Sequence, residues 1–211
     1  MNKSMLERFY REFEELETIP DRLDILTEFL RLGTGYSYKK REIITDALCD
    51  SIILSLCKSV EKHGDKVKNA MEKLDKENPV LKRKILYIKT VRDKMIAHLD
   101  TPTEITKVIE RHNFRQNELG RSIDEVVQSF NEIINWVLQV MGLKDYVRKL
   151  NKETNAGLTD FEIDEISEYD IFKNYLEQVR IFKQLSSIEF KELDNRLKKE
   201  IYKNDRKEYQ R

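Results

Sequence analysis

The sequence contains few residues that interrupt a helix. Only 6 glycines and 3 prolines occur in 211 residues, whereas charged residues make up 37% of the chain. A sheet-rich domain needs many turns, so this scarcity argues against one. Leucine, isoleucine, glutamate and lysine are abundant, and all except isoleucine rank among the best helix formers. We therefore predict an all-α protein with one large domain, or one domain and an appendage.

Signals for membranes, secretion and metals are also missing. No apolar run approaches the ~18 residues of a membrane span, and the charged N-terminal stretch lacks the apolar region of a signal peptide. The only cysteines, Cys49 and Cys57, lie in one apolar run without zinc-type spacing, which indicates buried free thiols in a reducing compartment. The histidines form no ligand cluster. We expect a soluble cytoplasmic protein with no metal and no cofactor.

The chain has no net charge of either sign, because Lys+Arg and Asp+Glu both number 39. A nucleic-acid partner would therefore need a local basic patch. One such patch occurs at residues 82–94, which contain six basic residues and only one acidic residue. Its candidate RNA contacts are Lys82, Arg83, Lys84 and Lys89.

Apolar periodicity, caps and breakers place the helices. They are expected at residues 2–17, 21–32, 39–62, 65–76, 79–100 and 122–141, with Asn78 and Ser122 as N-caps and Gly142 as the last stop. Residues 151–160 form the best linker. We divide the chain into a helical bundle at 1–150 and a C-terminal helical extension at 151–211, whose acidic stretch at 160–170 is read as a solvated helix face.

The helix expected at 79–100 has an unusual apolar seam. Its spacing places Arg92 where the pattern calls for leucine, between Ile88 and Met95. A guanidinium in a seam needs a carboxylate, a phosphate or a wet cleft. One reading is therefore a buried ion pair between Arg92 and a carboxylate such as Asp46 or Asp50.

A histidine follows the arginine six residues later. In a straight helix this separation means about 9 Å of rise and about 120° of rotation, so Arg92 and His98 cannot grip one small group together. Unwinding of the last turn or a facing second copy of the helix would resolve this. Taken alone, His98 also reads as a C-terminal histidine that interacts with the helix dipole.

The residues around Arg92 and His98 resemble a known sequence motif. Arg92-Asp93-Lys94, followed by Ala97-His98 and Asp100, is similar to the motif of the HEPN superfamily (higher eukaryotes and prokaryotes nucleotide-binding domains), in its abortive-infection branch. The order of helices fits an HEPN-like bundle over about residues 1–145. Asp93 replaces the commoner asparagine, and residues 151–211 have no counterpart.

The resemblance implies a metal-independent endoribonuclease that works as a homodimer, as a toxin or in phage defence. His98 would serve as general acid or base, and Arg92 would stabilise the scissile phosphate. Asp93, Lys94 and Asp100 would support them. The expected partners are RNA, a second copy and an antitoxin protein of the nucleotidyltransferase or DNA-binding type, with no membrane.

Two alternatives remain open. The first is a non-catalytic HEPN-like dimer that binds a nucleotide or a protein partner and keeps the motif as a structural polar cluster. The second is a helical scaffold whose function resides in the C-terminal extension. Metal-free RNA cleavage would separate the endoribonuclease from both.

Overall fold

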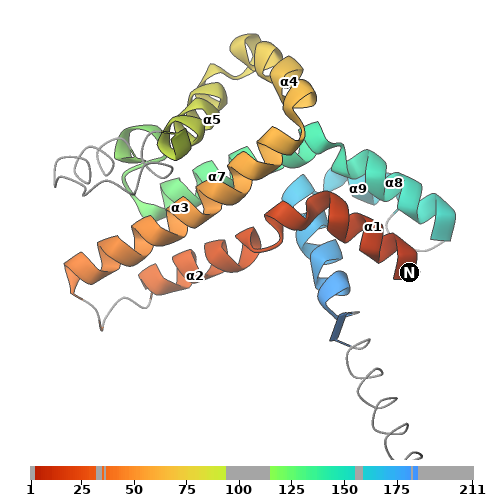
Figure 1. The fold of residues 1–211 in the computed structure, drawn as a ribbon, viewed down its shortest axis with the longest axis horizontal. Helices are drawn as coiled ribbons and strands as arrows, with labels where there is room; N and C mark the ends of the chain where they lie inside the picture. The colour runs from red at the N-terminus through yellow and green to blue at the C-terminus, as the bar shows by residue number, and fades with distance from the viewer. Residues whose placement is uncertain are drawn as a thin grey trace, which may run out of the picture.

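The computed structural model describes residues 3–31, 35, 37–93, 115–154, 159–181 and 183–184. Every regular element in these ranges is a helix (Figure 1), which confirms the predicted all-α class. Within the same ranges, no helix is long and apolar enough to cross a membrane.

The helices follow the expected order with small shifts at their ends. They are α1 (Lys3–Phe13), η1 (Glu14–Leu16), α2 (Ile19–Arg31), α3 (Tyr38–Lys62), α4 (Gly64–Glu77), α5 (Pro79–Val91), α7 (Ile123–Met141), α8 (Leu143–Thr154) and α9 (Asp160–Glu165). Residues 115–118 and 168–181 are also helical. Two expected ends were wrong. Helix α2 begins at Ile19 instead of residue 21, with Pro20 in its first turn, where its missing N–H does no harm. Residues 151–154 continue α8 instead of starting a linker.

Local capping chemistry sets several of these ends. The Asn78 side chain accepts a hydrogen bond from the Leu81 N–H at 3.0 Å, with proline at the first helical position of α5. Ser122 and Glu125 form a reciprocal capping box at the start of α7. Gly142 ends α7 in the left-handed conformation, with φ of 79°. These caps were predicted and are confirmed.

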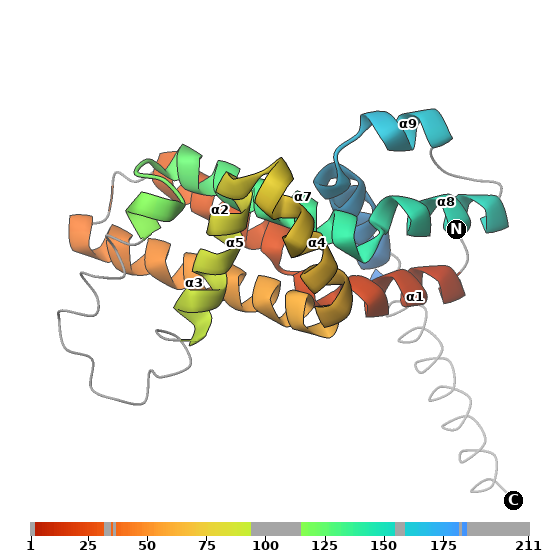
Figure 2. The same cartoon turned by 90° about the horizontal axis from the view of Figure 1, so that it is seen from above.

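The long helix α3 lies at the centre of the fold. It packs against α2, η1, α4, α5 and α7, and α2 lies alongside it in Figures 1 and 2. Its middle residues Ile52, Ile53 and Leu56 are fully buried, and Cys49 and Cys57 are buried free thiols as expected. The apolar stripe of α7 is also buried throughout, at Val126, Phe130, Ile133, Ile134 and Val137.

Part of the C-terminal segment belongs to this core. Phe172 is fully buried and lies 6.2 Å from Phe9 and 6.1 Å from Phe13, measured between ring centroids. Arg180 adds a bidentate ion pair with Asp21 of α2. The division at residue 150 stays a prediction, but helical residues 168–181 share one apolar cluster with α1.

The acids of residues 160–170 are exposed, as expected, except for Glu168, which is partly buried. Arg148 of α8 pairs with Asp160 and Asp164 of α9, and Lys144 lies 3.8 Å from Glu168. These acids therefore help to hold α9 against α8.

Candidate functional site

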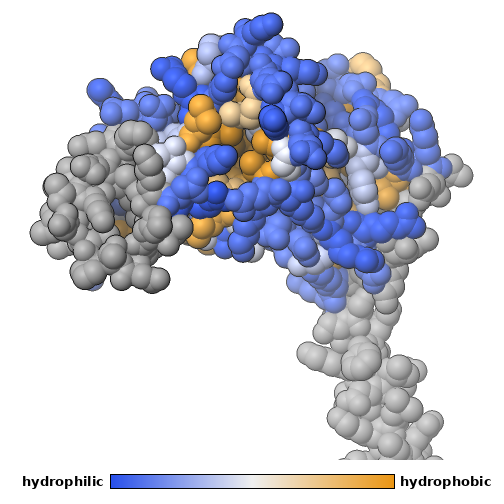
Figure 3. All heavy atoms as spheres, turned by 45° about the horizontal axis from the view of Figure 1, so that its top comes forward, coloured by the Kyte–Doolittle hydropathy of each residue, from blue (hydrophilic) through white to orange (hydrophobic). Residues whose placement is uncertain are grey.

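A hollow opens where α4 and α5 fold back over α3. Figures 1 and 2 show α4 leaving the C-terminal end of α3 and α5 returning over that helix. The space between the three helices, called here the α3–α4–α5 hollow, has a volume of about 640 Å³. Apolar atoms are exposed in this region in Figure 3. Its apolar lining consists of Cys57, Val60, Val67, Met71, Ile85, Leu86 and Ile88.

Arg92 lies at one edge of the hollow, directly after the last residue of α5. The regular α-helix changes here to a wider, π-type turn that contains Arg92 and Asp93. The Arg92 guanidinium pairs with Glu61 of α3 and also donates from Nε to Asp93 Oδ1 at 2.7 Å. The arginine side chain is 21% exposed, whereas Glu61 and Asp93 are 59% and 48% exposed. Arg92 therefore lies where the hollow meets solvent, and its positive charge is already paired with carboxylates.

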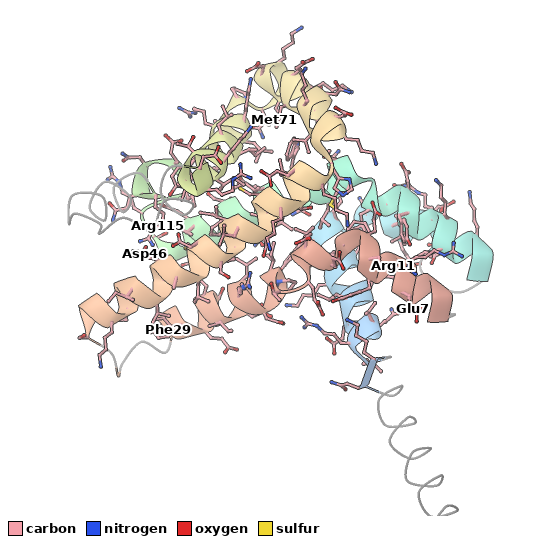
Figure 4. The ribbon with its side chains drawn as sticks, in the orientation of Figure 1. Glu7, Arg11, Phe29, Asp46, Met71 and Arg115 are labelled. Carbon is pink, nitrogen blue, oxygen red and sulfur yellow. The ribbon has the colours of Figure 1, made fainter. Side chains whose placement is uncertain are left out.

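The seam prediction holds as far as the structure describes it. Leu81, Ile85 and Ile88 are buried, and Arg92 follows them at the boundary between core and solvent. Arg92 does pair with a carboxylate of α3, but this is Glu61 and not Asp46 or Asp50. Among the described residues Arg92 contacts Glu61 and Asp93, while Asp46 pairs with Arg115, which Figure 4 shows beside it. Glu61 lies near the C-terminal end of α3. Arg92 reaches this carboxylate because α5 crosses α3 close to the hollow.

The remaining motif residues lie outside the described part of the chain. They are Lys94, His98 and Asp100, and His112 is outside it as well. Their roles and the predicted end of the motif helix stay predictions.

His63 is the histidine that the structure does describe. It is the C-cap residue of α3, as the sequence indicated. Burial lowers the pKa of His63, although Glu12, 4.0 Å away, opposes this shift. No group of three or more His, Cys, Asp or Glu side chains that could hold a metal occurs among the residues described.

The basic residues of α5 line two different hollows. Lys82 and Lys89 line the α3–α4–α5 hollow. Arg83 and Lys84 instead line a separate, smaller hollow next to the α7 side. Residues one apart on a helix differ by about 100° in direction, so a run of charges in sequence wraps around α5. That these four residues contact RNA stays a prediction, and the structure divides them between two hollows.

Two of the four candidate RNA contacts are already paired. Lys82 pairs with Asp75 of α4, and Lys84 lies 2.6 Å from Glu132 of α7. Among the described residues no carboxylate pairs with Arg83 or Lys89. Both of these side chains are exposed, but only Lys89 lies on the same hollow as Arg92.

Sequence reasoning missed Glu61 and the hollow itself. Glu61 is one of many glutamates, and nothing in its neighbourhood distinguishes it from a solvated residue. Cys57, correctly predicted as buried, lies in the lining. Burial raises the pKa of its thiol to about 11, against an opposing effect of the nearby Arg92 charge. A buried thiol with a raised pKa is a poor nucleophile, so we assign Cys57 to the apolar wall of the hollow.

Comparison of the chain with protein-family models, with curated proteins and with solved structures returned no significant match.

Proposed function

We propose that this protein is a metal-independent endoribonuclease of the HEPN type. The observation that carries the proposal is the placement of Arg92. It lies at the solvent-exposed end of the core-facing helix α5, on the edge of a hollow that other cations also line. The motif resemblance adds His98 as the acid-base residue. The Arg92 side chain is 21% exposed at this edge and pairs with Glu61 and Asp93, so a phosphate arriving from solvent would exchange with one of these carboxylates at the guanidinium.

The proposed reaction needs only proton transfer and charge stabilisation. The ribose 2′-oxygen loses its proton to a base and attacks phosphorus. The bond from phosphorus to the 5′-oxygen breaks, and that oxygen takes up a proton. The products are a 2′,3′-cyclic phosphate and a 5′-hydroxyl. His98 would move one of these protons. Arg92 would neutralise the negative charge that develops on the phosphate.

The supporting residues have distinct proposed tasks. Asp93 already accepts two hydrogen bonds from Arg92, at 2.7 and 2.5 Å, and so orients the guanidinium. Lys94 would add a phosphate contact, and Asp100 would support His98. In the cell, we propose a toxin or phage-defence role in the cytoplasm, with an antitoxin partner.

Homodimerisation is part of the same proposal. A facing copy of the motif helix would bring Arg92 of one chain toward His98 of the other. We expect light scattering at micromolar concentration to give about twice the 25.3 kDa mass of one chain. A monomer under those conditions would contradict the composite site.

One observation favours the non-catalytic alternative. The ion pair between Arg92 and Glu61 joins α5 to α3, and a residue that links two helices can be kept for structure alone. In that case the protein would be a binding module for a nucleotide or a protein partner.

Cleavage without metal separates the two functions. We expect the purified protein to cut single-stranded RNA in excess EDTA and to leave 2′,3′-cyclic phosphate ends, detectable by mass spectrometry. Substrate with 2′-deoxy linkages should resist cleavage because it lacks the attacking oxygen. An intact RNA substrate at high protein concentration would favour the binding module.

RNA affinity should depend on which face of α5 carries the substituted basic residue. We expect Lys89→Glu to weaken RNA binding because Lys89 lies on the same hollow as Arg92. Arg83→Glu makes the same kind of charge reversal on the other face of the helix. It should have a much smaller effect.

The measurement is fluorescence anisotropy with labelled RNA at several salt concentrations. Loss of one phosphate contact should lower the slope of log affinity against log salt by about 0.7 for single strands. Equal effects of the two variants would mean that binding does not use the hollow side.

A further inference from the structure

The α3–α4–α5 hollow has the size of a small-molecule site. Its volume of about 640 Å³ lies within the ~300–1,000 Å³ range of such pockets. Three helices line it, and the lining is predominantly apolar. At its rim Leu86 remains 46% exposed, one of the few large apolar side chains left in water among the described residues. An apolar group seated in the hollow would cover this surface.

The charged residues around the apolar lining favour an anionic group. Four cations and two carboxylates line the hollow: Lys68, Lys82, Lys89, Arg92, Glu61 and Glu72. Glu61 is engaged by Arg92, and Lys82 is engaged by Asp75. This leaves two lysines against one carboxylate.

The two remaining lysines can serve both parts of such a ligand. Their alkyl stems extend the apolar wall, while their ammonium groups stay at the mouth. An apolar tail would therefore meet the lining while an attached negative charge reaches Lys89 or Lys68.

We propose that the α3–α4–α5 hollow binds an amphiphilic monoanion, with a single aliphatic tail against the lining and a carboxylate or phosphate head at Lys89 and Lys68. This inference does not depend on RNA cleavage, because it rests on the shape and charge of the hollow alone. It concerns a ligand that enters from solution as a monomer.

Gly64 offers a way to plug the hollow. It lines the space at the start of α4, and a Cβ added there would meet nothing within 4 Å. Gly64→Leu should therefore add a bulky side chain to the wall of the hollow without a backbone clash, and it removes a poor helix former from a helix. Gly35→Leu is the matched control because a Cβ there also meets nothing within 4 Å, outside the hollow.

The test uses the full chain and the fluorescent probe 11-(dansylamino)undecanoate. We expect saturable binding with a blue-shifted emission, unchanged in Gly35→Leu and weakened about tenfold or more in Gly64→Leu, since the added side chain occupies the tail site. Leu86→Glu, which changes an exposed rim residue and so should spare the fold, should also weaken binding.

The head group is tested separately. Lys89→Glu should weaken binding of the acid about fivefold, as expected for a partly exposed ion pair, and should leave the neutral 11-(dansylamino)undecanol unaffected. Equal affinity of wild type for the acid and the alcohol would overturn the anion assignment. Unchanged binding in both Gly64→Leu and Leu86→Glu would overturn the site.

Discussion

Arg92→Ala and His98→Ala are each expected to abolish RNA cleavage while the helical fold persists. Loss of a general acid-base group typically costs about 10²–10⁴-fold in rate, and loss of a donor that stabilises transition-state charge costs about 10²–10³-fold. The double variant should be scarcely slower than either single variant, because residues that act as a unit are not additive. The measurement is a single-turnover cleavage assay in EDTA.

The contacts of Arg92 make this experiment interpretable. Its carboxylate partners, Glu61 and Asp93, are 59% and 48% exposed, so water can solvate them when the guanidinium is removed. The stability cost should stay near the ~0–1 kcal/mol of an exposed ion pair. It should not reach the ~3–5 kcal/mol of a broken buried one. A large drop in stability would indicate a structural role for Arg92.

Arg180→Ala is the matched control. It also removes a partly exposed arginine from carboxylate contacts, here with Asp21. Arg180 lies in the C-terminal helical segment, and it does not line the hollow. Cleavage should therefore stay at the wild-type rate. An Arg92→Ala variant that still cleaves RNA would contradict the proposed mechanism.

The second large effect concerns the C-terminal segment. Phe172→Ala should lower the free energy of unfolding by about 3–5 kcal/mol, because it empties a fully buried aromatic position beside Phe9 and Phe13. Urea unfolding can be followed through Trp136, the only tryptophan. Trp136 is buried in α7, so it reports on the bundle and not on the mutated helix.

Phe161→Ala is the control for this change. Phe161 is 74% exposed, and its truncation should alter stability by no more than about 0.5 kcal/mol. If residues 168–181 share a cooperative unit with the bundle, the Trp136 transition moves to lower urea in Phe172→Ala. An unchanged transition would show instead that the segment after residue 150 unfolds independently.

The sequence by itself determined the helical class and most helix ends. The signals involved act over a few residues: a side-chain oxygen three positions from an N–H, as at Ser122, or a glycine that accepts positive φ, as at Gly142. The α7 stripe is similarly local, since one face repeats every 3.6 residues. Such signals were readable because both partners lie in the same short stretch of chain.

The tertiary structure alone decided which groups meet across helices. Glu61 reaches Arg92 from a different helix, and no local pattern distinguishes Glu61 from Asp46 or Asp50 as the partner. The answer depends on where α5 crosses α3, which the packing of both helices sets jointly.

The basic residues of α5 illustrate the same limit. The sequence placed four cations close together along the chain, but helical rotation sent Lys82 and Lys89 to one hollow and Arg83 and Lys84 to another. Phe172 likewise joins α1 only because the chain folds back on itself. Composition and spacing name the charged and apolar groups, whereas the crossing of the helices determines which of them share a surface.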